Sequence, residues 1–155
     1  MSAAVLELVG LIKEFGLKER TLRILHGLDC VVHPGEFVGI MGASGSGKTT
    51  LLNILGCLDR PSAGAYRLDG RDVSLLDDDE LARVRNRSIG FVFQSFQLIP
   101  QLTVLENVEL PLFYEGTRKK TRRARCEEML ASVGMTHRLQ SNPTQLSGGE
   151  CQRVA

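Results

Sequence analysis

Hydrophobic and polar positions in the first half of the chain alternate over short stretches, a pattern typical of strands. Residues 5–12 and 21–32 predict two strands, and a His-Pro-Gly turn at 33–35 precedes a continuous apolar run at 36–41. A second continuous apolar run occupies residues 88–93. Because both runs are short and flanked by glycine or polar residues, we expect buried strands there, the first of them in a parallel sheet.

Helical spacing separates and follows these strands. Leucine and isoleucine at helical intervals predict a largely buried helix over 48–57, with apolar positions Leu51, Leu52, Ile54, Leu55 and Leu58. Further expected elements are a small hairpin around 65–70, helices over 77–87, 103–110 and 122–133, and a helix that starts at Glu150. Strands that alternate with helices predict an α/β fold with a helical insert in the second half.

Composition narrows the class of protein only slightly. The 155 residues carry 19 Lys+Arg against 18 Asp+Glu, so net charge indicates no polyanionic partner. No apolar run approaches the roughly 20 residues that span a bilayer, so we expect any membrane role to act through a partner. The four cysteines lack metal-ligand or CxxC spacing and the first ten residues do not resemble a secretory signal, which favours a cytosolic protein.

The segment between the 36–41 run and the following helix carries the first candidate chemistry. It fits the pattern G-x-x-x-x-G-K-[ST], and we expect its residues to bind a nucleotide: Gly42, Ala43, Ser44, Gly45, Ser46, Gly47, Lys48, Thr49 and Thr50. Glycines let backbone N–H groups turn toward phosphate oxygens, and the helix start adds its positive end. Lys48 is placed to bridge the β- and γ-phosphates, and Thr49 to offer a hydroxyl to Mg²⁺. The alternative is a Gly/Ser-rich helix cap, which does not require this lysine and threonine.

A second Gly/Ser-rich segment lies near the end of the chain. Leu146 is followed by Ser147, Gly148, Gly149 and Glu150, and then by Gln-Arg-Val-Ala. A serine and two glycines that open a helix can present backbone N–H groups to an anion. A Ser-Gly-Gly helix cap is common, so this segment carries meaning only because it follows a phosphate-binding loop and precedes that particular continuation.

Together these segments resemble the ATP-binding subunits of ABC transporters. The LSGGE segment, here called the signature segment (residues 146–150), resembles the family's LSGGQ, with Glu150 in place of the usual Gln. The stretches LLNILGCLDRPSAGAYRLDG, IGFVFQSFQLIPQLTVLENVELPL and QLSGGECQRVA resemble the lipoprotein-releasing and macrolide-export group. The resemblance runs from about Leu6 to Ala155.

The resemblance implies roles for two further residues. Gln94 matches the glutamine that contacts Mg²⁺ and the attacking water, so it joins Thr49 as a metal-binding candidate; a polar strand end is the alternative. Phe15 matches an aromatic residue that stacks on adenine, and a core phenylalanine is the alternative. The implied architecture is a RecA-like P-loop NTPase core with an antiparallel β-subdomain over about 1–94, and a helical subdomain over about 95–155.

The resemblance also implies partners and a location. Two ATP-binding subunits would pair head to tail, each ATP held by the loop of one and the signature segment of the other. Separate permease subunits would convert that motion into transport at the cytoplasmic face of the inner membrane. The basic run over 118–125 lacks interleaved aromatics, so we expect a solvated helix face and no nucleic-acid partner; contact with anionic lipid is a lesser alternative.

The family's water-activating residues are absent from the sequence as given. The Walker B Asp and Glu and the switch His follow the signature helix in the family, and this sequence ends at Ala155. His26, His33 and His137 all precede the signature segment. We therefore expect a C-terminally truncated domain without its own ATPase activity. A non-hydrolysing remnant and a soluble ABC ATPase outside transport remain alternatives.

Overall fold

The computed structural model describes residues 3–17 and 20–155, which form two compact units, Met1–Ile89 and Gly90–Ala155. Each unit has its own hydrophobic core. No helix in the described part of the chain is long and apolar enough to cross a membrane.

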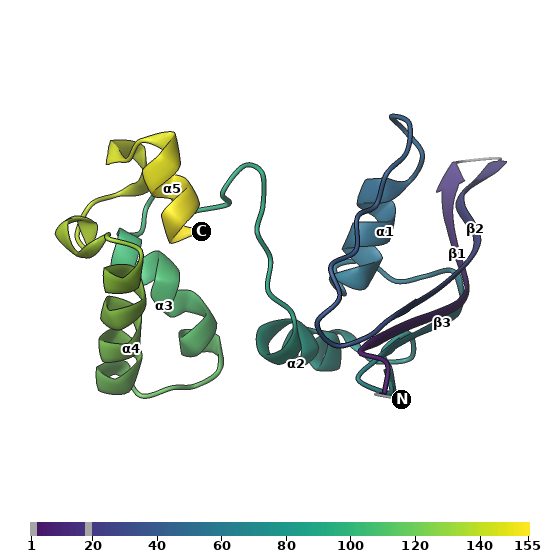
Figure 1. Cartoon of the computed structure of the whole chain (residues 1–155), viewed down its shortest axis with the longest axis horizontal. Helices are drawn as coiled ribbons and strands as arrows, with labels where there is room; N and C mark the ends of the chain where they lie inside the picture. The colour runs from purple at the N-terminus through teal and green to yellow at the C-terminus, as the bar shows by residue number, and fades with distance from the viewer. Residues whose placement is uncertain (1–2, 18–19) are drawn as a thin grey trace. The chain divides into compact units, whose positions relative to one another are not determined.

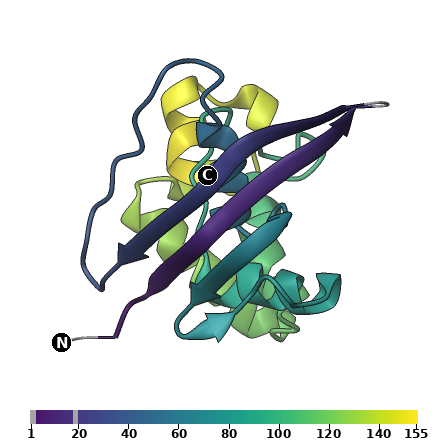
Figure 2. The ribbon, with the colours of Figure 1, turned by 90° about the vertical axis from the view of Figure 1, so that its right-hand side faces the viewer.

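The first unit is built on a four-stranded antiparallel sheet. Its strands are β1 (Leu6–Leu17), β2 (Arg20–Val32), β3 (Ala63–Leu68) and β4 (Arg71–Asp72), in the order β2-β1-β3-β4. The long hairpin of β1 and β2 runs diagonally in Figure 2, with β3 beside β1. Both strands of the hairpin occur where the alternating pattern predicts them, and β1 extends beyond the predicted end at residue 12.

An irregularity in β1 requires two glycines. The register of β1 with β3 shifts between Val9 and Ile12, and Gly10 there has φ +55°. Gly64 of β3 has φ +88°, and a Cβ on it would lie 2.4 Å from the carbonyl oxygen of Gly10. The Gly10 N–H donates to Asp29 Oδ1 at 2.7 Å. The two backbones therefore approach as closely as they do only because Gly64 has no side chain.

Helix α1 (Lys48–Leu55) belongs to the same unit as the sheet (Figure 1). Ile54 is buried in one cluster with Leu11, Leu25 and Tyr66. The Tyr66 hydroxyl donates to the Leu55 carbonyl at 2.8 Å, and burial raises the Tyr66 pKa. This hydrogen bond ties the end of α1 to β3.

The predicted burial of this helix is only partly right. Leu52 of α1 is 54% exposed, and Leu58, which lies beyond the end of the helix, is 50% exposed, so not every apolar position of the predicted pattern is buried. Only one face of α1 finds partners among the described residues of the first unit.

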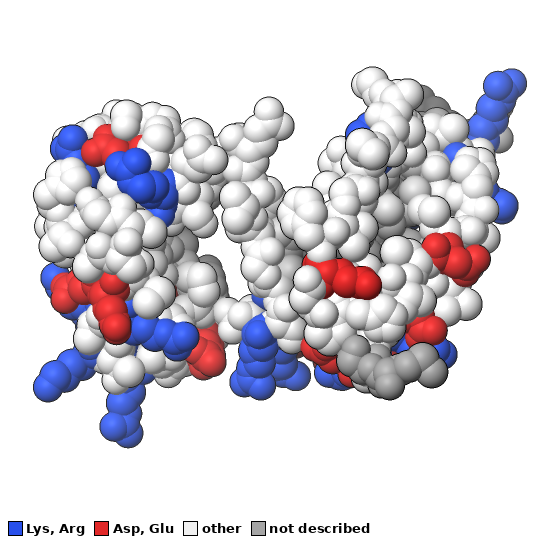
Figure 3. All heavy atoms as spheres, in the orientation of Figure 1, with Lys and Arg blue, Asp and Glu red and all other residues white. Residues whose placement is uncertain are grey.

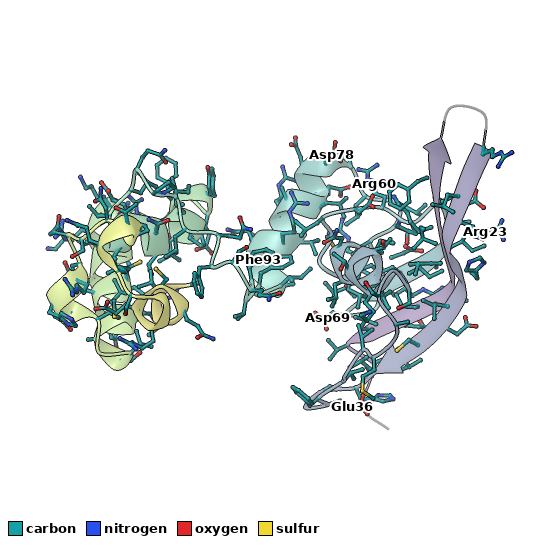
Figure 4. The ribbon with its side chains drawn as sticks, turned by 90° about the horizontal axis from the view of Figure 1, so that it is seen from above. Arg23, Glu36, Arg60, Asp69, Asp78 and Phe93 are labelled. Atoms are coloured by element: carbon teal, nitrogen blue, oxygen red, sulfur yellow. The ribbon has the colours of Figure 1, made fainter. Side chains whose placement is uncertain are left out.

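Helix α2 (Asp78–Ser88) closes the first unit and begins as the sequence predicts. The Asp77 side chain accepts from the Glu80 N–H, and the Glu80 side chain accepts from the Asp77 N–H, which is a capping box. Arg60 donates to the Asp78 carboxylate at 2.7 Å, and the two residues lie together in Figure 4. Arg85 donates to the Cys57 carbonyl at 2.7 Å. These contacts hold α2 against the segment that follows α1.

Two predicted buried strands, over 36–41 and 88–93, are corrected by the structure. Neither segment contains a strand, and residue 88 is the last residue of α2. Phe37 and Met41 are 99% and 93% exposed, and Val92 is 84% exposed. Figure 4 labels Glu36 and Phe93, one in each segment. The physical reason is pairing: a buried strand needs neighbours for its backbone groups, and the described sheet pairs only β1 to β4.

The second unit is helical. It contains α3 (Val104–Tyr114), α4 (Lys119–Ser132), short 3₁₀ turns at Thr136–Arg138 and Pro143–Gln145, and α5 (Gly148–Val154). Its buried cluster comprises Val104, Leu105, Cys126, Leu130, Met135 and Val154. The helices begin where the sequence predicts to within three residues, with α4 earlier than residue 122 and α5 earlier than Glu150.

Two largely buried polar contacts fix α3 within this unit. The Asn107 side chain accepts from the Ile99 N–H at 2.7 Å and donates to the Ile99 and Thr103 carbonyls. Arg122 of α4 pairs with Glu109 of α3 at 3.1 Å, with side-chain exposures of 12% and 13%. The first contact holds the loop before α3, and the second joins α3 to α4.

The basic run over 118–125 is therefore only partly a free charged face. Arg122 pairs with Glu109, and Arg123 pairs with Glu127 one helical turn along. Other Lys and Arg side chains project near the beginning of α4, at the lower end of this unit in Figure 3. The solvated helix face expected from the sequence thus contains internal ion pairs as well as projecting charges.

Candidate functional site

The start of α1 is the strongest candidate site in the first unit. Residues 42–46 are exposed and turn back through a hydrogen bond from the Ser46 N–H to the Ala43 carbonyl at 3.3 Å. Gly47 is the N-cap residue, at φ 90° and ψ 7°, and no side chain caps the helix there. The first turn of α1 also contains no acidic residue. The positive end of this helix is therefore open to an external anion.

Two glycines of this loop lie close to neighbouring atoms, and one of them, Gly47, occupies a position that other residues would not fit. A Cβ on Gly42 would lie 2.8 Å from Ser46 Oγ. A Cβ on Gly47 would lie 2.9 Å from Ile24 Cγ2 and 3.2 Å from Leu25 Cδ2, in a left-handed conformation that favours glycine. The loop thus bends tightly and presses its last glycine against β2.

Lys48 and Thr49 complete the loop with side-chain chemistry. The Lys48 ammonium donates to the Gly42 carbonyl at 2.9 Å and to the Ala43 carbonyl at 2.7 Å, so it lies across its own loop. Thr49 is an exposed residue in the first turn of α1 and offers a hydroxyl oxygen, a donor type that Mg²⁺ accepts. Thr50 follows it in the same turn and is half-buried.

The structure shows how Phe15 relates to this loop. Phe15 pairs with Leu22 across the β1–β2 hairpin, and Gly47 packs against Ile24, two residues further along β2. Two residues of an extended strand span roughly 7 Å. The Phe15 side chain is partly open, since the residue is 40% exposed. Phe15 therefore lies on the same hairpin that Gly47 of the loop contacts, across from a residue two positions before Ile24.

Gln94 and the signature segment belong to the second unit. Gln94 is exposed and lies in a turn after residues 90–93, which form neither helix nor strand, so it is not at the end of a strand. Ser147 is the N-cap of α5, and Gly148 and Gly149 form the first residues of that helix. A Cβ on Gly148 would meet nothing within 4 Å, so this glycine borders open space.

Glu150 is bound tightly to the start of α5. Its carboxylate accepts from the Ser147 N–H and from the Ser147 hydroxyl, both at 2.8 Å, and from Arg138 Nε at 3.0 Å. These three donors, led by the Ser147 backbone N–H, lower the Glu150 pKa to about 2. His137 Nε2 lies 3.8 Å from the same carboxylate. The helix start therefore carries its own anion.

Sequence reasoning missed Arg138 as a partner of Glu150. The two residues are twelve positions apart and are joined only through the turns over 136–145, which the pattern did not predict. Sequence reasoning also missed Lys13, whose ammonium lies 4.9 Å from the centroid of the Phe15 ring. The signal for Lys13 was available, because positions i and i+2 of a strand share a face.

No three His, Cys, Asp or Glu side chains gather as a metal site within residues 3–17 and 20–155. Mg²⁺ commonly uses one or two protein ligands together with the phosphates of its substrate. The residues present, in particular the Thr49 hydroxyl beside the open start of α1, suit that mode of binding.

Comparison with known proteins defines the class. The chain matches the family described as ABC transporter over residues 25–155. YknY of Bacillus subtilis, an ABC transporter ATP-binding protein, is 52% identical over 97% of this chain and 66% of its own length. The macrolide export ATP-binding/permease protein MacB of Marinobacter nauticus is 54% identical over 97% of this chain and 23% of its own length.

A solved structure agrees with these sequence relatives. The ATP-binding cassette MJ0796, in a dimeric post-hydrolysis state bound to ADP and Pi, superposes with a TM-score of 0.85 at 44% identity. The match covers 96% of this chain and 66% of that one. The protein belongs to the ABC transporter family. Its predicted class, an α/β P-loop NTPase with an antiparallel sheet and a helical part, is confirmed. The chain spans 66% of YknY and 23% of MacB.

Proposed function

We propose that this protein is the ATP-binding subunit of an ABC transporter and binds Mg-ATP at the start of α1. The observation that carries this proposal is the open helix start: a glycine N-cap at φ 90°, no acid in the first turn, and Lys48 folded over the loop. Backbone N–H groups there would cradle the phosphates, and Lys48 would exchange its carbonyl partners for phosphate oxygens.

The remaining predicted residues have roles in the same proposal. Phe15 would stack on adenine, supported by its partial exposure and by its position on the hairpin that Gly47 contacts. Thr49 would hold Mg²⁺ through its hydroxyl, and Gln94 would contribute its side-chain oxygen. Bound Mg²⁺ would neutralise phosphate charge during transfer to water.

The signature segment would act on the ATP of a second copy. We propose that two copies pair head to tail, so that Ser147, Gly148, Gly149 and Glu150 of one face the nucleotide bound at α1 of the other. The dimeric form of MJ0796, bound to ADP and Pi, supports the pairing of two copies for a protein of similar fold. ATP binding would close the pair, and hydrolysis in the whole protein would reopen it.

The whole protein would drive transport through permease partners on the cytoplasmic face of the inner membrane. MacB combines ATP-binding and permease parts in one protein, which supports a permease partner for this chain as well. Its name also supports placing this protein in the macrolide-export group. That grouping rests on the sequence identity with MacB, which is 54% over 97% of this chain.

Calorimetric titration with nucleotides in the presence of Mg²⁺ tests the proposal. A phosphate-directed site binds ATP and ADP more tightly than AMP, because AMP lacks the β-phosphate that the loop would cradle. Adenosine serves as the control for binding through the base alone. Equal affinities for ATP and adenosine, or no saturable binding of ATP, would refute the proposed function.

A further inference from the structure

A lysine is buried beside the aromatic residue of the proposed base site. Lys13 is 9% exposed, and its ammonium donates to Asp59 Oδ1 at 2.6 Å and to the Arg60 carbonyl at 2.8 Å. The same ammonium lies 4.9 Å from the centroid of the Phe15 ring. A buried ammonium is unfavourable unless it is paired, and here two oxygens and a ring surround it. Its position is therefore well determined.

These contacts connect two parts of the candidate nucleotide site. Lys13 and Phe15 are at positions i and i+2 of β1 and so share one face of the strand. Asp59 follows α1, the helix whose start forms the phosphate loop. Lys13 therefore joins the segment after the phosphate-binding helix to the aromatic ring on the hairpin.

The Phe15 ring is also partly accessible to solvent beside the cation. An ammonium over one face of a phenyl ring is attracted by its quadrupole and restrains the ring's rotation. Phe15 nevertheless remains 40% exposed, so part of its ring faces solvent. A restrained ring loses less conformational entropy when a base stacks on it than a freely rotating ring does. The restrained and partly exposed Phe15 ring is therefore better suited to stacking.

We propose that Lys13 is a positioning residue for the nucleobase: it holds the Phe15 ring at a fixed place relative to the phosphate loop. This inference rests on the proposed function, in which Phe15 stacks on adenine. Lys13 itself would not touch the nucleotide. Its effect would be confined to ligands that carry a base, because the phosphates are bound by a different segment, residues 42–49.

The test compares ATP with inorganic tripolyphosphate, each titrated with Mg²⁺ into the wild-type protein and variants by calorimetry. Lys13→Met keeps the length and apolar stem of the side chain and removes the charge. We expect ATP affinity to fall roughly 3- to 10-fold, the range of a partly desolvated cation–π contact, with tripolyphosphate affinity unchanged. Lys13→Arg should restore most of the loss. Arg23→Gln, which removes an exposed ion pair with Glu14 on the same hairpin, should change neither affinity.

A double-mutant cycle with Phe15→Leu separates positioning from general stability. If Lys13 acts through the ring, Lys13→Met should weaken ATP binding no further once Phe15 is leucine. Equal losses of ATP and tripolyphosphate affinity in Lys13→Met, or full additivity with Phe15→Leu, would overturn the proposal. If Lys13→Met unfolds the protein, Asp59→Asn replaces it, since that variant loosens the ammonium but retains it. The loss of affinity in Asp59→Asn should be smaller than in Lys13→Met and again limited to ATP. An equal loss of tripolyphosphate affinity would contradict the positioning role of Lys13.

The outcomes also separate this inference from the proposed function. Wild-type protein that binds neither ligand would refute nucleotide binding itself. Wild-type protein that binds both ligands, with Phe15→Leu leaving their ratio unchanged, would refute stacking on Phe15 and with it the role of Lys13. A changed ratio in Phe15→Leu but an unchanged ratio in Lys13→Met would leave the base site standing and overturn the role of Lys13 alone.

Discussion

Two helices of this protein, α1 and α5, begin at glycine- and serine-rich segments, yet the two starts differ in charge and in capping. The start of α1 has a glycine N-cap, no side-chain cap and no acid in its first turn. The start of α5 has a complete capping box in which Ser147 and Glu150 bond to each other, and Arg138 supports the carboxylate. The first start leaves its positive end for a ligand, whereas the second already holds an anion of its own.

The difference shows that glycine and serine content alone does not identify an anion site. At α1 the N-cap glycine is required by geometry, because Gly47 lies against Ile24 in a left-handed conformation. At α5 a Cβ on Gly148 would meet open space, so no contact within the second unit requires a glycine at this position. We infer that α1 is built to receive phosphate from solution, and that the small residues of α5 are suited to the approach of another molecule.

The largest expected effect is on nucleotide binding through Lys48. Replacing Lys48 with Ala removes the only side-chain cation of the loop, and we expect ATP affinity to fall roughly 10- to 100-fold, as for other hydrogen bonds to charged groups. Calorimetric titration measures the change. Lys120→Ala, on the exposed side of α4, is the matched control and should bind ATP like the wild type. An unchanged affinity in Lys48→Ala would show that α1 is not the phosphate site.

The same substitution at the two helix starts should have unequal effects. Gly47→Ala places a Cβ at φ 90° and 2.9 Å from Ile24 Cγ2, so we expect the free energy of unfolding to fall by about 1–3 kcal/mol. Gly148→Ala meets no neighbour, and we expect a change within about 1 kcal/mol, in either direction. Urea denaturation followed by circular dichroism compares the two variants. Similar losses of stability in Gly47→Ala and Gly148→Ala would contradict the interpretation that the start of α1 is sterically constrained and the start of α5 is not.

Local chemistry explains which parts of the fold could be predicted from the sequence. The β1–β2 hairpin follows from alternation, the β3–β4 turn from Asp69-Gly70, and the start of α2 from the capping residues Asp77 and Glu80. Each of these sequence signals determines the structure of residues only a few positions away. The phosphate loop is equally local, because its glycines and Lys48 are consecutive.

The failures have a common physical cause in long-range partners. Apolar runs at 36–41 and 88–93 predict extended chain, but their burial depends on neighbouring strands, and Phe37 and Val92 remain exposed. The Arg138–Glu150 pair likewise depends on turns that carry no strong sequence pattern. The roles of Phe15, Gln94 and the signature segment stay predictions, with the geometry on β1 supporting the first of them.

Removing the cap of α5 should have a moderate effect. Ser147→Ala deletes the hydroxyl that accepts from the Glu150 N–H and donates to the Glu150 carboxylate, so we expect a loss of about 1 kcal/mol in stability. Thr103→Ala removes the equivalent hydroxyl from the capping box of α3 and is the matched comparison, with a loss of similar size. Hydrogen exchange of the helix amides measures each effect locally. No change at α5 in Ser147→Ala would mean that the capping box there contributes nothing.

The smallest expected effect concerns the charge of Glu150 and its dependence on pH. Folding lowers the Glu150 pKa from an ordinary value of 4.5 to about 2. The carboxylate therefore contributes stability that is fully present above pH 4.5 and is lost as the pH falls toward 2. Glu150→Gln keeps a hydrogen-bond acceptor but removes the charge, so the wild type should be the more stable of the two at pH 6.

The decisive measurement is how the difference in the free energy of unfolding between the wild type and Glu150→Gln changes with pH. Urea denaturation of both proteins between pH 6 and the acid limit of folding should show the advantage of the wild type shrinking below pH 4.5. A difference that stays constant would mean that Glu150 acts by shape alone and that the charge bound to Arg138 adds nothing. A shrinking difference would establish that the start of α5 is stabilised by its own carboxylate.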